Sequence, residues 1–385
     1  MKILTISNYF PNHAGGIEIV AKNLVENWRE QHIVHWAACE VEVWEGLTED
    51  DVSLSACNFT ETRLGFPYPI PFPKSILKIV SQVRWCDIVH IHDCLYLPNL
   101  IAFLSAKILS KPLIITQHIG IVPYREKYKI LLQKIAYKTL GNMILRGSDK
   151  VVFINDKIRK WFTRNMALKH TVVLQNGVDR RLFFPIQSKI EKSDIRKKIG
   201  VSENDFVLLF VGRFTSKKGI DIIHEIARSC PHYKWLMVGS GDELVSKWKL
   251  KNVNVFSFQS QNMLREYYIA ADLFVLPSRG EGFPLSVQEA LACGLPAAVS
   301  EETASSLPDA PLISLDLESI SNIIKTLDNA AAHPELLREL SGKSAEYAKK
   351  WDWSLISMQY LEQFKTASRN TDKHPWAKKD VRREK

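Results

Sequence analysis

The chain has 385 residues, of which 46% are hydrophobic and 24% charged, and its formal net charge is +9. This length allows two domains of ordinary size, and the composition is that of a folded protein. No apolar run reaches the roughly 18 residues that a membrane span needs. The six cysteines form no CxxC pair, so the sequence favours neither a zinc site nor a disulfide framework. The first residues turn polar too soon for a signal peptide, and we expect a cytoplasmic protein.

Strand and helix patterns alternate along the first half, which is typical of a parallel sheet covered by helices. Residues 40–73 are the exception, because they are rich in Thr, Glu, Pro and aromatic residues and predict only a short strand or two between loops. Strands are expected at 3–7, 32–38, 87–92, 112–117, 150–154 and 172–174, and helices at 17–28, 74–83, 97–109, 128–145 and 157–166.

Residues 180–203 hold a charged run without a strand pattern, and we interpret them as the connection to a second domain. Alternation then resumes. Strands are expected at 206–211, 235–238, 253–256, 272–276 and 295–299, and helices at 220–229, 263–270, 284–293, 317–331, 334–349 and 354–364. The predicted fold class is α/β, with two Rossmann-like doubly wound domains that face each other across a cleft.

The most informative stretch, residues 272–299, reads as strand, turn, helix and strand. Pro284 suits a first helical position, and Gly294 suits the residue just past a helix end. Glu281 precedes this helix and Glu289 lies inside it. Because a helix N-terminus after a parallel strand favours phosphate, a nucleotide diphosphate could lie between the two acids. They could instead form a glycosidase pair, which their spacing does not exclude, or Glu281 could only cap the helix.

Two cations follow the strand at 206–211. Arg213 offers a planar fork to phosphate, and Lys218, which we favour over the neighbouring Lys217 because it precedes a glycine, offers a compact charge. Because Gly219 is followed by Ile220 rather than by Lys and Ser or Thr, the loop is not a Walker A motif. A further glycine turn at Gly239 could lie under a nucleotide.

The first half contributes fewer candidates. Gly15 and Gly16 lie between its first strand and first helix, where backbone can approach an anion closely. His118 ends the strand at 112–117. His90 is expected in the core, whereas His92, followed by Asp93, lies at a strand end where both could reach a ligand. No His and Asp cluster has the spacing of a metal site.

These motifs together resemble the retaining glycosyltransferases of family 4, which have the GT-B fold. The resemblance extends in order over nearly the whole chain, and its most specific part is the paired-glutamate stretch. The matching segments are 15–18, 117–118, 176–179, 212–219, 239–241 and 281–296.

The resemblance implies roles for individual residues. Arg213 and Lys218 would bind the donor diphosphate, Glu289 the ribose hydroxyls, and Glu281 the donor sugar, with His118 near the reacting carbon. The implied catalytic residues are His118, Glu281, Arg213 and Lys218. The implied donor-binding residues are Gly15, Gly16, Arg213, Lys218, Gly239, Glu281, Gly282, Phe283, Pro284, Leu285 and Glu289. The resemblance implies no bound metal, and the sequence offers no DxD motif in a plausible loop. No cofactor is expected either, because the nucleotide sugar is a substrate.

The resemblance also assigns acceptor binding to residues 1–182, with a C-terminal helix at about 352–368 packing back on them, and donor binding to 183–351. Residues 369–385 are expected to be a basic, disordered tail. The expected partners are a nucleotide-sugar donor and a saccharide or lipid-linked acceptor, without nucleic acid. The expected role is in surface polysaccharide, lipopolysaccharide or glycolipid synthesis.

Basic helices would suit peripheral binding to an anionic membrane on its inner face. Two alternatives stay open from the residues themselves. One is a nucleotide-sugar epimerase or hydrolase on a similar fold, and the other is a non-catalytic glycan- or nucleic-acid-binding protein.

Overall fold

The computed structural model describes residues 1–13, 15–40, 44–64, 68–121, 126–186, 188–241, 245–257, 259–279, 281 and 283–371. The chain divides into two compact units, Met1–Asn176 with Trp353–Lys385 (unit 1) and Gly177–Asp352 (unit 2). The predicted disordered tail from 372 onward lies outside the described residues. Residues 369–371, which were predicted as part of that tail, instead continue the last helix.

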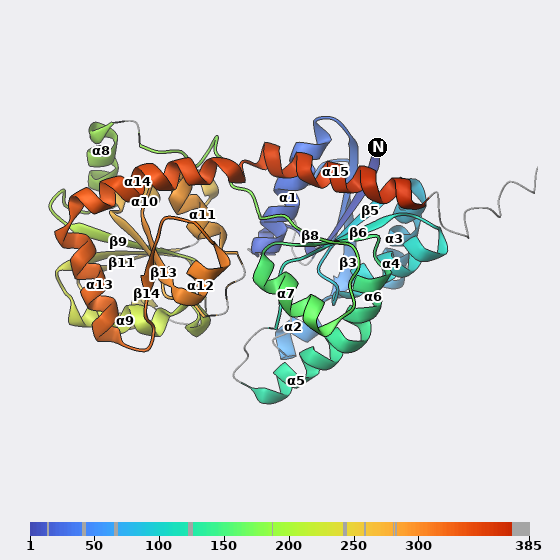
Figure 1. Ribbon diagram of the computed structural model, residues 1–385, viewed down its shortest axis with the longest axis horizontal. Helices are drawn as coiled ribbons and strands as arrows, with labels where there is room; N and C mark the ends of the chain where they lie inside the picture. Colours follow the sequence, from blue (N-terminus) through green and yellow to red (C-terminus); the bar gives the residue numbers. More distant parts are fainter. Residues whose placement is uncertain are drawn as a thin grey trace, which may run out of the picture. The chain divides into compact units, whose positions relative to one another are not determined.

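Unit 1 is built on a sheet that, in the described residues, has eight strands in the order β4-β3-β2-β1-β5-β6-β7-β8 (Figure 1). Neighbouring strands are parallel except β3 and β4, which are antiparallel. The strands are β1 Lys2–Tyr9, β2 Ile33–Glu40, β3 Asp51–Cys57, β4 Ile70–Pro71, β5 Ile88–His92, β6 Leu113–Gln117, β7 Lys150–Phe153 and β8 Thr171–Val173. The strand order reverses between β1 and β5, which is where doubly wound sheets bind ligands.

Helices cover this sheet because their apolar residues repeat at helical spacing. In α1, Val20, Leu24 and Trp28 lie four residues apart and are all buried. The C-terminal helix α15 lies beside α1 (Figure 1). The helical segments are η1 Pro11–His13, α1 Gly16–Arg29, α2 Phe59–Leu64, α3 Pro73–Trp85, α4 Leu97–Ile108, α5 Lys127–Ala136, η2 Tyr137–Gly141, α6 Asn142–Gly147, α7 Asp156–Asn165 and α15 Trp353–Thr371.

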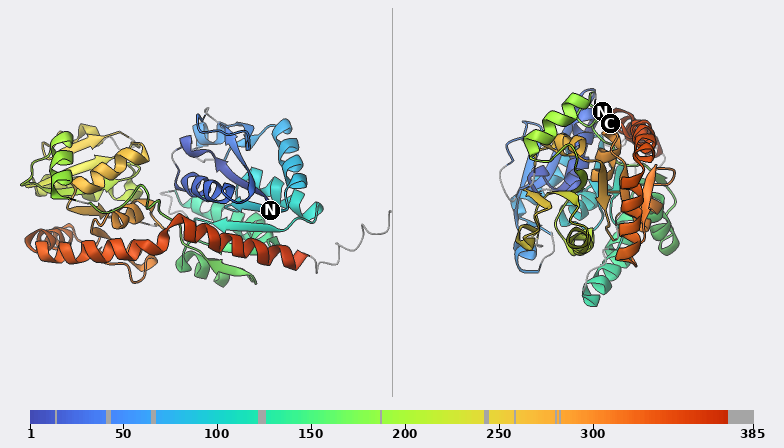
Figure 2. Two further views of the ribbon diagram at one scale, coloured as in Figure 1. Left: turned by 90° about the horizontal axis from the view of Figure 1, so that it is seen from above. Right: turned by 90° about the vertical axis from the view of Figure 1, so that its left-hand side faces the viewer.

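The long helix predicted at 128–145 is continuous but not regular. A π-helical turn, η2, separates α5 from α6. The segment α5–η2–α6 extends away from the rest of unit 1 in the views of Figure 1 and Figure 2. Its exposed large apolar side chains are Tyr128, Leu131, Leu132, Ile135, Leu140 and Met143.

Unit 2 has six described strands in the order β11-β10-β9-β12-β13-β14, all parallel. They are β9 Phe206–Val211, β10 Tyr233–Val238, β11 Val253–Phe256, β12 Leu273–Leu276, β13 Ala297–Ser300 and β14 Leu312–Leu315. The strand order reverses between β9 and β12, so the loops after these two strands meet at the switch point. The fold class predicted from the sequence is confirmed for both sheets.

The helical segments of unit 2 are α8 Lys189–Ile199, η3 Ser216–Lys218, α9 Ile220–Ser229, η4 Val245–Trp248, α10 Gln261–Ala270, α11 Leu285–Ala292, α12 Glu301–Ser306, α13 Ile320–Ala332, α14 Pro334–Ala348 and η5 Lys349–Trp351. The sequence did not predict three of these elements, namely α8, which begins unit 2's fold, the short helix α12, and the strand β14, nor the short segments η3, η4 and η5. None of the described helices is long and apolar enough to span a bilayer.

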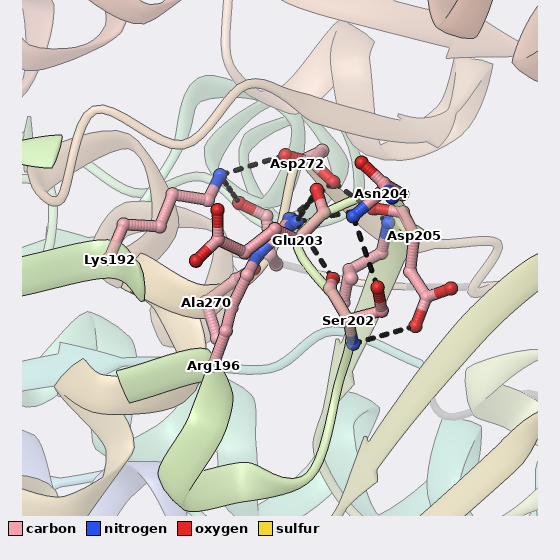
Figure 3. A network of polar contacts seen from close by, with 10 residues as sticks. Lys192, Arg196, Ser202, Glu203, Asn204, Asp205, Ala270 and Asp272 are labelled. Carbon is pink, nitrogen blue, oxygen red and sulfur yellow. Dashed lines mark hydrogen bonds and ion pairs between the residues drawn. The ribbon is translucent and has the colours of Figure 1, made fainter. Parts of the chain in front are cut away.

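A polar network fixes α8 to the sheet (Figure 3). Arg196 Nη2 and Lys192 Nζ donate to the carboxylate of Asp272 at 2.6 and 2.8 Å. The same carboxylate accepts from the backbone N–H of Val207 at the start of β9. Arg196 also donates to the carbonyl of Ala270, so one buried guanidinium joins α8 to the residues that precede β12. The network lies at the edge of the sheet opposite the switch-point loops.

Candidate active site

The loops after β9 and β12 carry the charged residues of unit 2's switch point. After β9, the chain passes through Gly212 and Arg213 into the short helix η3, which ends at Lys218. After β12, it passes through Ser278 and Arg279 toward Glu281. The backbone N–H of Arg279 donates to the carbonyl of Lys217 at 2.8 Å, which ties the two loops together.

Lys218 and Glu281 form an ion pair across these loops. Lys218 Nζ lies 2.8 Å from Glu281 Oε1, and the two side chains are only 19% and 11% exposed. Two charges this well shielded interact more strongly than a pair in open solvent. The pair therefore places one strong cation and one carboxylate at the carboxyl end of β12.

Two further cations surround Glu281. Burial raises the pKa of Glu281, but Lys218 and Lys217 outweigh burial, with a smaller effect of Arg213, so the pKa lies below its ordinary value. Burial lowers the pKa of Lys217, although Glu281 opposes this. Arg213 is exposed. The site consequently holds more positive than negative charge, as an anionic ligand requires.

Glycines let these loops approach each other. Gly219 has φ +77°, and a Cβ atom there would lie 2.1 Å from the carbonyl oxygen of Pro277. Gly239 has φ +149°, and a Cβ atom there would lie 2.0 Å from the carbonyl oxygen of Gly212. Both positions combine a left-handed backbone with a contact that no side chain could make, so these glycines shape the site.

Glu289 lies in the middle of α11 and is buried. Its Oε2 accepts a hydrogen bond from the hydroxyl of Tyr268 at 2.7 Å. Burial raises the pKa of Glu289 to about 7, although the Tyr268 hydrogen bond lowers it. The carboxylate has few donors in the described structure, and it could accept more from a ligand's hydroxyl groups.

The residues between the two glutamates begin α11. Pro284 is the N-cap rather than the first helical residue, and α11 starts at Leu285. No side chain caps this helix, so its first N–H groups remain available to an anion. Phe283 is buried and packs edge-on against Trp351. Gly282 lies outside the described residues.

Unit 1 contributes a buried histidine pair at its own switch point. His118, which follows β6, lies with its Nε2 2.8 Å from Nδ1 of His92, and the two rings are stacked. Burial lowers the pKa of His118 to about 3, so the ring is neutral at physiological pH. Neutral imidazole can donate or accept a hydrogen bond at a sugar without adding charge.

Asp93 holds His118 from the other side. Its Oδ1 accepts from the backbone N–H of His118 at 2.8 Å, and its backbone has φ +64°, which is uncommon outside glycine. Burial raises the pKa of Asp93 to about 7, although the hydrogen bond from the backbone N–H of His118 lowers it. His92 and Asp93, which end a strand where both could reach a ligand, are buried beside His118, which is itself buried. His90 lies in the core, as predicted.

Gly15 and Gly16 begin α1, which follows β1 at the same switch point. Gly15 is the N-cap, and a Cβ atom there would lie 1.9 Å from Oε2 of Glu18. The buried Glu18 side chain thus folds back over the glycine. The predicted residues therefore form two groups, one in each unit, at the carboxyl ends of the strands.

Two family models match this chain. "Glycosyltransferase Family 4" matches residues 14–182, and "Glycosyl transferases group 1" matches residues 191–306. Together they cover most of both units. The chain belongs to glycosyltransferase family 4.

Characterised relatives of this family 4 glycosyltransferase match at low identity over long stretches. An N,N'-diacetylbacillosaminyl-diphospho-undecaprenol alpha-1,3-N-acetylgalactosaminyltransferase of Campylobacter jejuni is 24% identical, over 78% of this chain and 83% of the relative. A GDP-mannose:cellobiosyl-diphosphopolyprenol alpha-mannosyltransferase of Xanthomonas oryzae is 21% identical, over 95% and 97%. The structure of HepE from Anabaena in complex with UDP-glucose has a TM-score of 0.76 at 18% identity, over 95% of this chain and 100% of that one. The fold is therefore GT-B, and the enzyme is a retaining glycosyltransferase.

One residue of the family 4 glycosyltransferase completes these groups without having been considered from the sequence, namely Tyr268. Lys217, His92 and Asp93 were considered from the sequence, and the structure places them beside Glu281 and His118. Nothing local marks Tyr268, which reaches Glu289 from another helix. Among the described residues, no three His, Cys, Asp or Glu side chains lie close enough to share a metal ion.

Proposed function

We propose that this enzyme transfers a sugar, with retention of configuration, from a nucleotide-diphosphate donor to a lipid-linked saccharide during synthesis of a surface polysaccharide, lipopolysaccharide or glycolipid. The observation that carries this proposal is the shielded Lys218–Glu281 pair at the switch point of unit 2, with Lys217 and Arg213 beside it. This set can hold a diphosphate while it presents a carboxylate to the attached sugar.

The transfer breaks the bond between the sugar's anomeric carbon and the diphosphate. Negative charge grows on the leaving phosphate, and Arg213, Lys218 and the N-terminus of α11 stabilise that charge more in the transition state than in the ground state. The acceptor oxygen forms the new bond on the same face, and its proton passes to the departing phosphate oxygen. This route retains configuration without an enzyme nucleophile.

The remaining predicted residues position the donor. Glu289 accepts hydrogen bonds from the ribose hydroxyls, while Gly239 allows the backbone to lie close to the nucleotide. Glu281 binds hydroxyls of the sugar. His118, neutral and held by His92 and Asp93, hydrogen-bonds the sugar near the reacting carbon, and Gly15 and Gly16 offer backbone N–H groups.

Two observations support a lipid-linked acceptor. The names of the Campylobacter and Xanthomonas relatives both include a polyprenol diphosphate-linked saccharide. The segment α5–η2–α6 exposes a row of apolar side chains beside Lys127, Lys134 and Lys138. An exposed apolar and basic helix is suited to the surface of an anionic membrane. We place the enzyme in the cytoplasm, bound peripherally to the inner face of the membrane.

A transfer assay tests the proposal. The full chain is incubated with UDP-, GDP-, dTDP- and ADP-sugars and a polyprenyl-diphosphate-linked saccharide, and the anomeric configuration of the product is determined. We expect Lys218→Gln to lower kcat/KM on the order of 100-fold, because a cation aimed at the leaving group is lost. Arg228→Gln is the matched control, since Arg228 is exposed on α9, and it should retain native activity.

Two outcomes would contradict this assignment. If a folded Lys218→Gln protein transfers sugar at the native rate, Lys218 does not act on the donor diphosphate and the proposed site is wrong. If the donor is consumed at the same rate with and without acceptor, the enzyme is a hydrolase rather than a transferase.

A further inference from the structure

A cavity of about 530 Å³ lies in unit 1 at the edge of the sheet where the strands begin. Its walls come from α4, the end of α6 with the turn into β7, and the segment that leads into β8. His118 and Asp93 follow the opposite ends of β6 and β5. The five residues of β6 span about 16 Å, so the cavity is well separated from the residues proposed to bind the sugar.

The cavity is rich in positive charge. Its basic lining residues are Lys107, Arg146, Lys169 and His170, against one acid, Asp149. Asp149 Oδ2 already accepts from the backbone N–H of Leu113 at 2.8 Å and lies 3.8 Å from Lys107 Nζ. In the part of the chain that the structure describes, no acidic side chain lies within ion-pairing distance of Arg146 or Lys169. Arg146 and Lys169, which are both exposed, therefore give the lining an excess of positive charge.

We propose that this cavity binds a phosphate group, as a monoester or a diester, at a site separate from the donor diphosphate. Arginine matches the geometry of a phosphate with two N–H groups, and lysine adds a compact charge. The volume is in the range of small-molecule sites and exceeds what phosphate alone needs, so the ligand carries an organic part. Among the described lining residues, only His170 has an aromatic ring, which gives a nucleobase little to stack on.

Such a phosphate could come from a lipid headgroup or from a soluble ester. The cavity borders Arg146, the end of the exposed apolar and basic segment α5–η2–α6, which favours a lipid. The chemistry that recognises the phosphate is the same in both cases, and the experiment has an arm for each source.

The first arm titrates the full chain with inorganic phosphate and with glycerol 3-phosphate by calorimetry. The second measures flotation with vesicles of phosphatidylcholine that contain phosphatidic acid or phosphatidylglycerol, against phosphatidylcholine alone. The test protein is the double variant Arg146→Gln with Lys169→Gln. Its matched control is Lys74→Gln with Arg84→Gln, which removes the same charge from exposed positions of α3 outside the cavity.

We expect the cavity variant to bind at least about 10-fold more weakly than the control variant in one of the two arms, which corresponds to about 1.4 kcal/mol. Loss in the first arm identifies a soluble phosphate ester, and loss only in the second identifies a lipid headgroup. Equal behaviour of the two variants in both arms overturns the proposal. Neither arm depends on sugar transfer, so the result is independent of the proposed function.

Discussion

At the scale of single residues, Glu289 makes stability depend on pH. Burial raises its pKa to about 7. A carboxyl whose pKa is raised on folding stabilises the fold fully below its unfolded-state pKa, about 4.3, and this contribution is lost as the pH rises through about 7. We expect Glu289→Gln to remove about 3 kcal/mol of the decline in the free energy of unfolding between pH 4.5 and 7.5. Urea unfolding at several pH values measures it.

The control for this experiment is Glu225→Gln, which changes an exposed carboxyl on α9. It should keep the native pH dependence. An unchanged pH dependence in Glu289→Gln would mean that the buried carboxyl is not protonated in the folded protein near neutral pH.

The sequence predicted those candidate site residues that lie close in the chain to a recognisable motif. Arg213, Lys218 and Glu281 each lie next to a glycine after a strand, and Glu289 lies inside the short helix that follows such a turn. Tyr268 carries no such mark, because its partner Glu289 is 21 residues away and comes close only when α10 and α11 pack. A local sequence pattern cannot predict which residues become partners only through tertiary packing.

At the scale of elements, Gly219 decides how η3 meets the loop after β12. Alanine at this position would meet the carbonyl oxygen of Pro277 at 2.1 Å as well as adopting φ +77°. We expect Gly219→Ala to lower the free energy of unfolding of unit 2 by about 3 kcal/mol or more, because strain and overpacking add. Chemical denaturation, monitored by hydrogen exchange read separately for each unit, measures this loss of stability.

Gly200 provides the matched comparison. It has φ +80° at the end of α8, but a Cβ atom there has nothing within 4 Å. Gly200→Ala should therefore lower the free energy of unfolding by only about 1 kcal/mol, which is the cost of a left-handed backbone at alanine. Equal costs at the two positions would show that contact with Pro277 does not constrain the loop.

The elements themselves were predictable where their patterns are long. The helical spacing of apolar residues predicted α1 correctly, because one face of that helix is buried. The continuous apolar run predicted β9 correctly, because both faces of that strand are buried. The π-turn η2 was not predictable, because it adds one residue to a helix without changing its composition. The strand β14 has only four residues, and α8 is joined to the sheet by Arg196, whose partners Ala270 and Asp272 lie far along the sequence.

At the scale of the whole molecule, unit 1 is closed by the last described residues of the chain. Trp28 of α1 donates its Nε1–H to the carbonyl of Ser357 at 3.1 Å. Phe364 is fully buried, and its ring centroid lies 5.0 Å from that of Trp28 and 5.6 Å from that of His90. Thus α15, which follows all of unit 2 in the sequence, supplies part of the core of unit 1. Unit 1 cannot complete its core until α15 has been synthesised.

This arrangement predicts which unit each core substitution weakens. Phe364→Ala should lower the free energy of unfolding of unit 1 by about 3–5 kcal/mol, because it leaves a cavity against Trp28 and His90. Phe210→Ala, in the core of β9, should lower that of unit 2 by a similar amount. Hydrogen exchange read separately on β5 and β9 distinguishes the two. If Phe364→Ala weakens protection in β9 as much as in β5, the two units unfold as one, and the division of the chain into independently stable units is wrong.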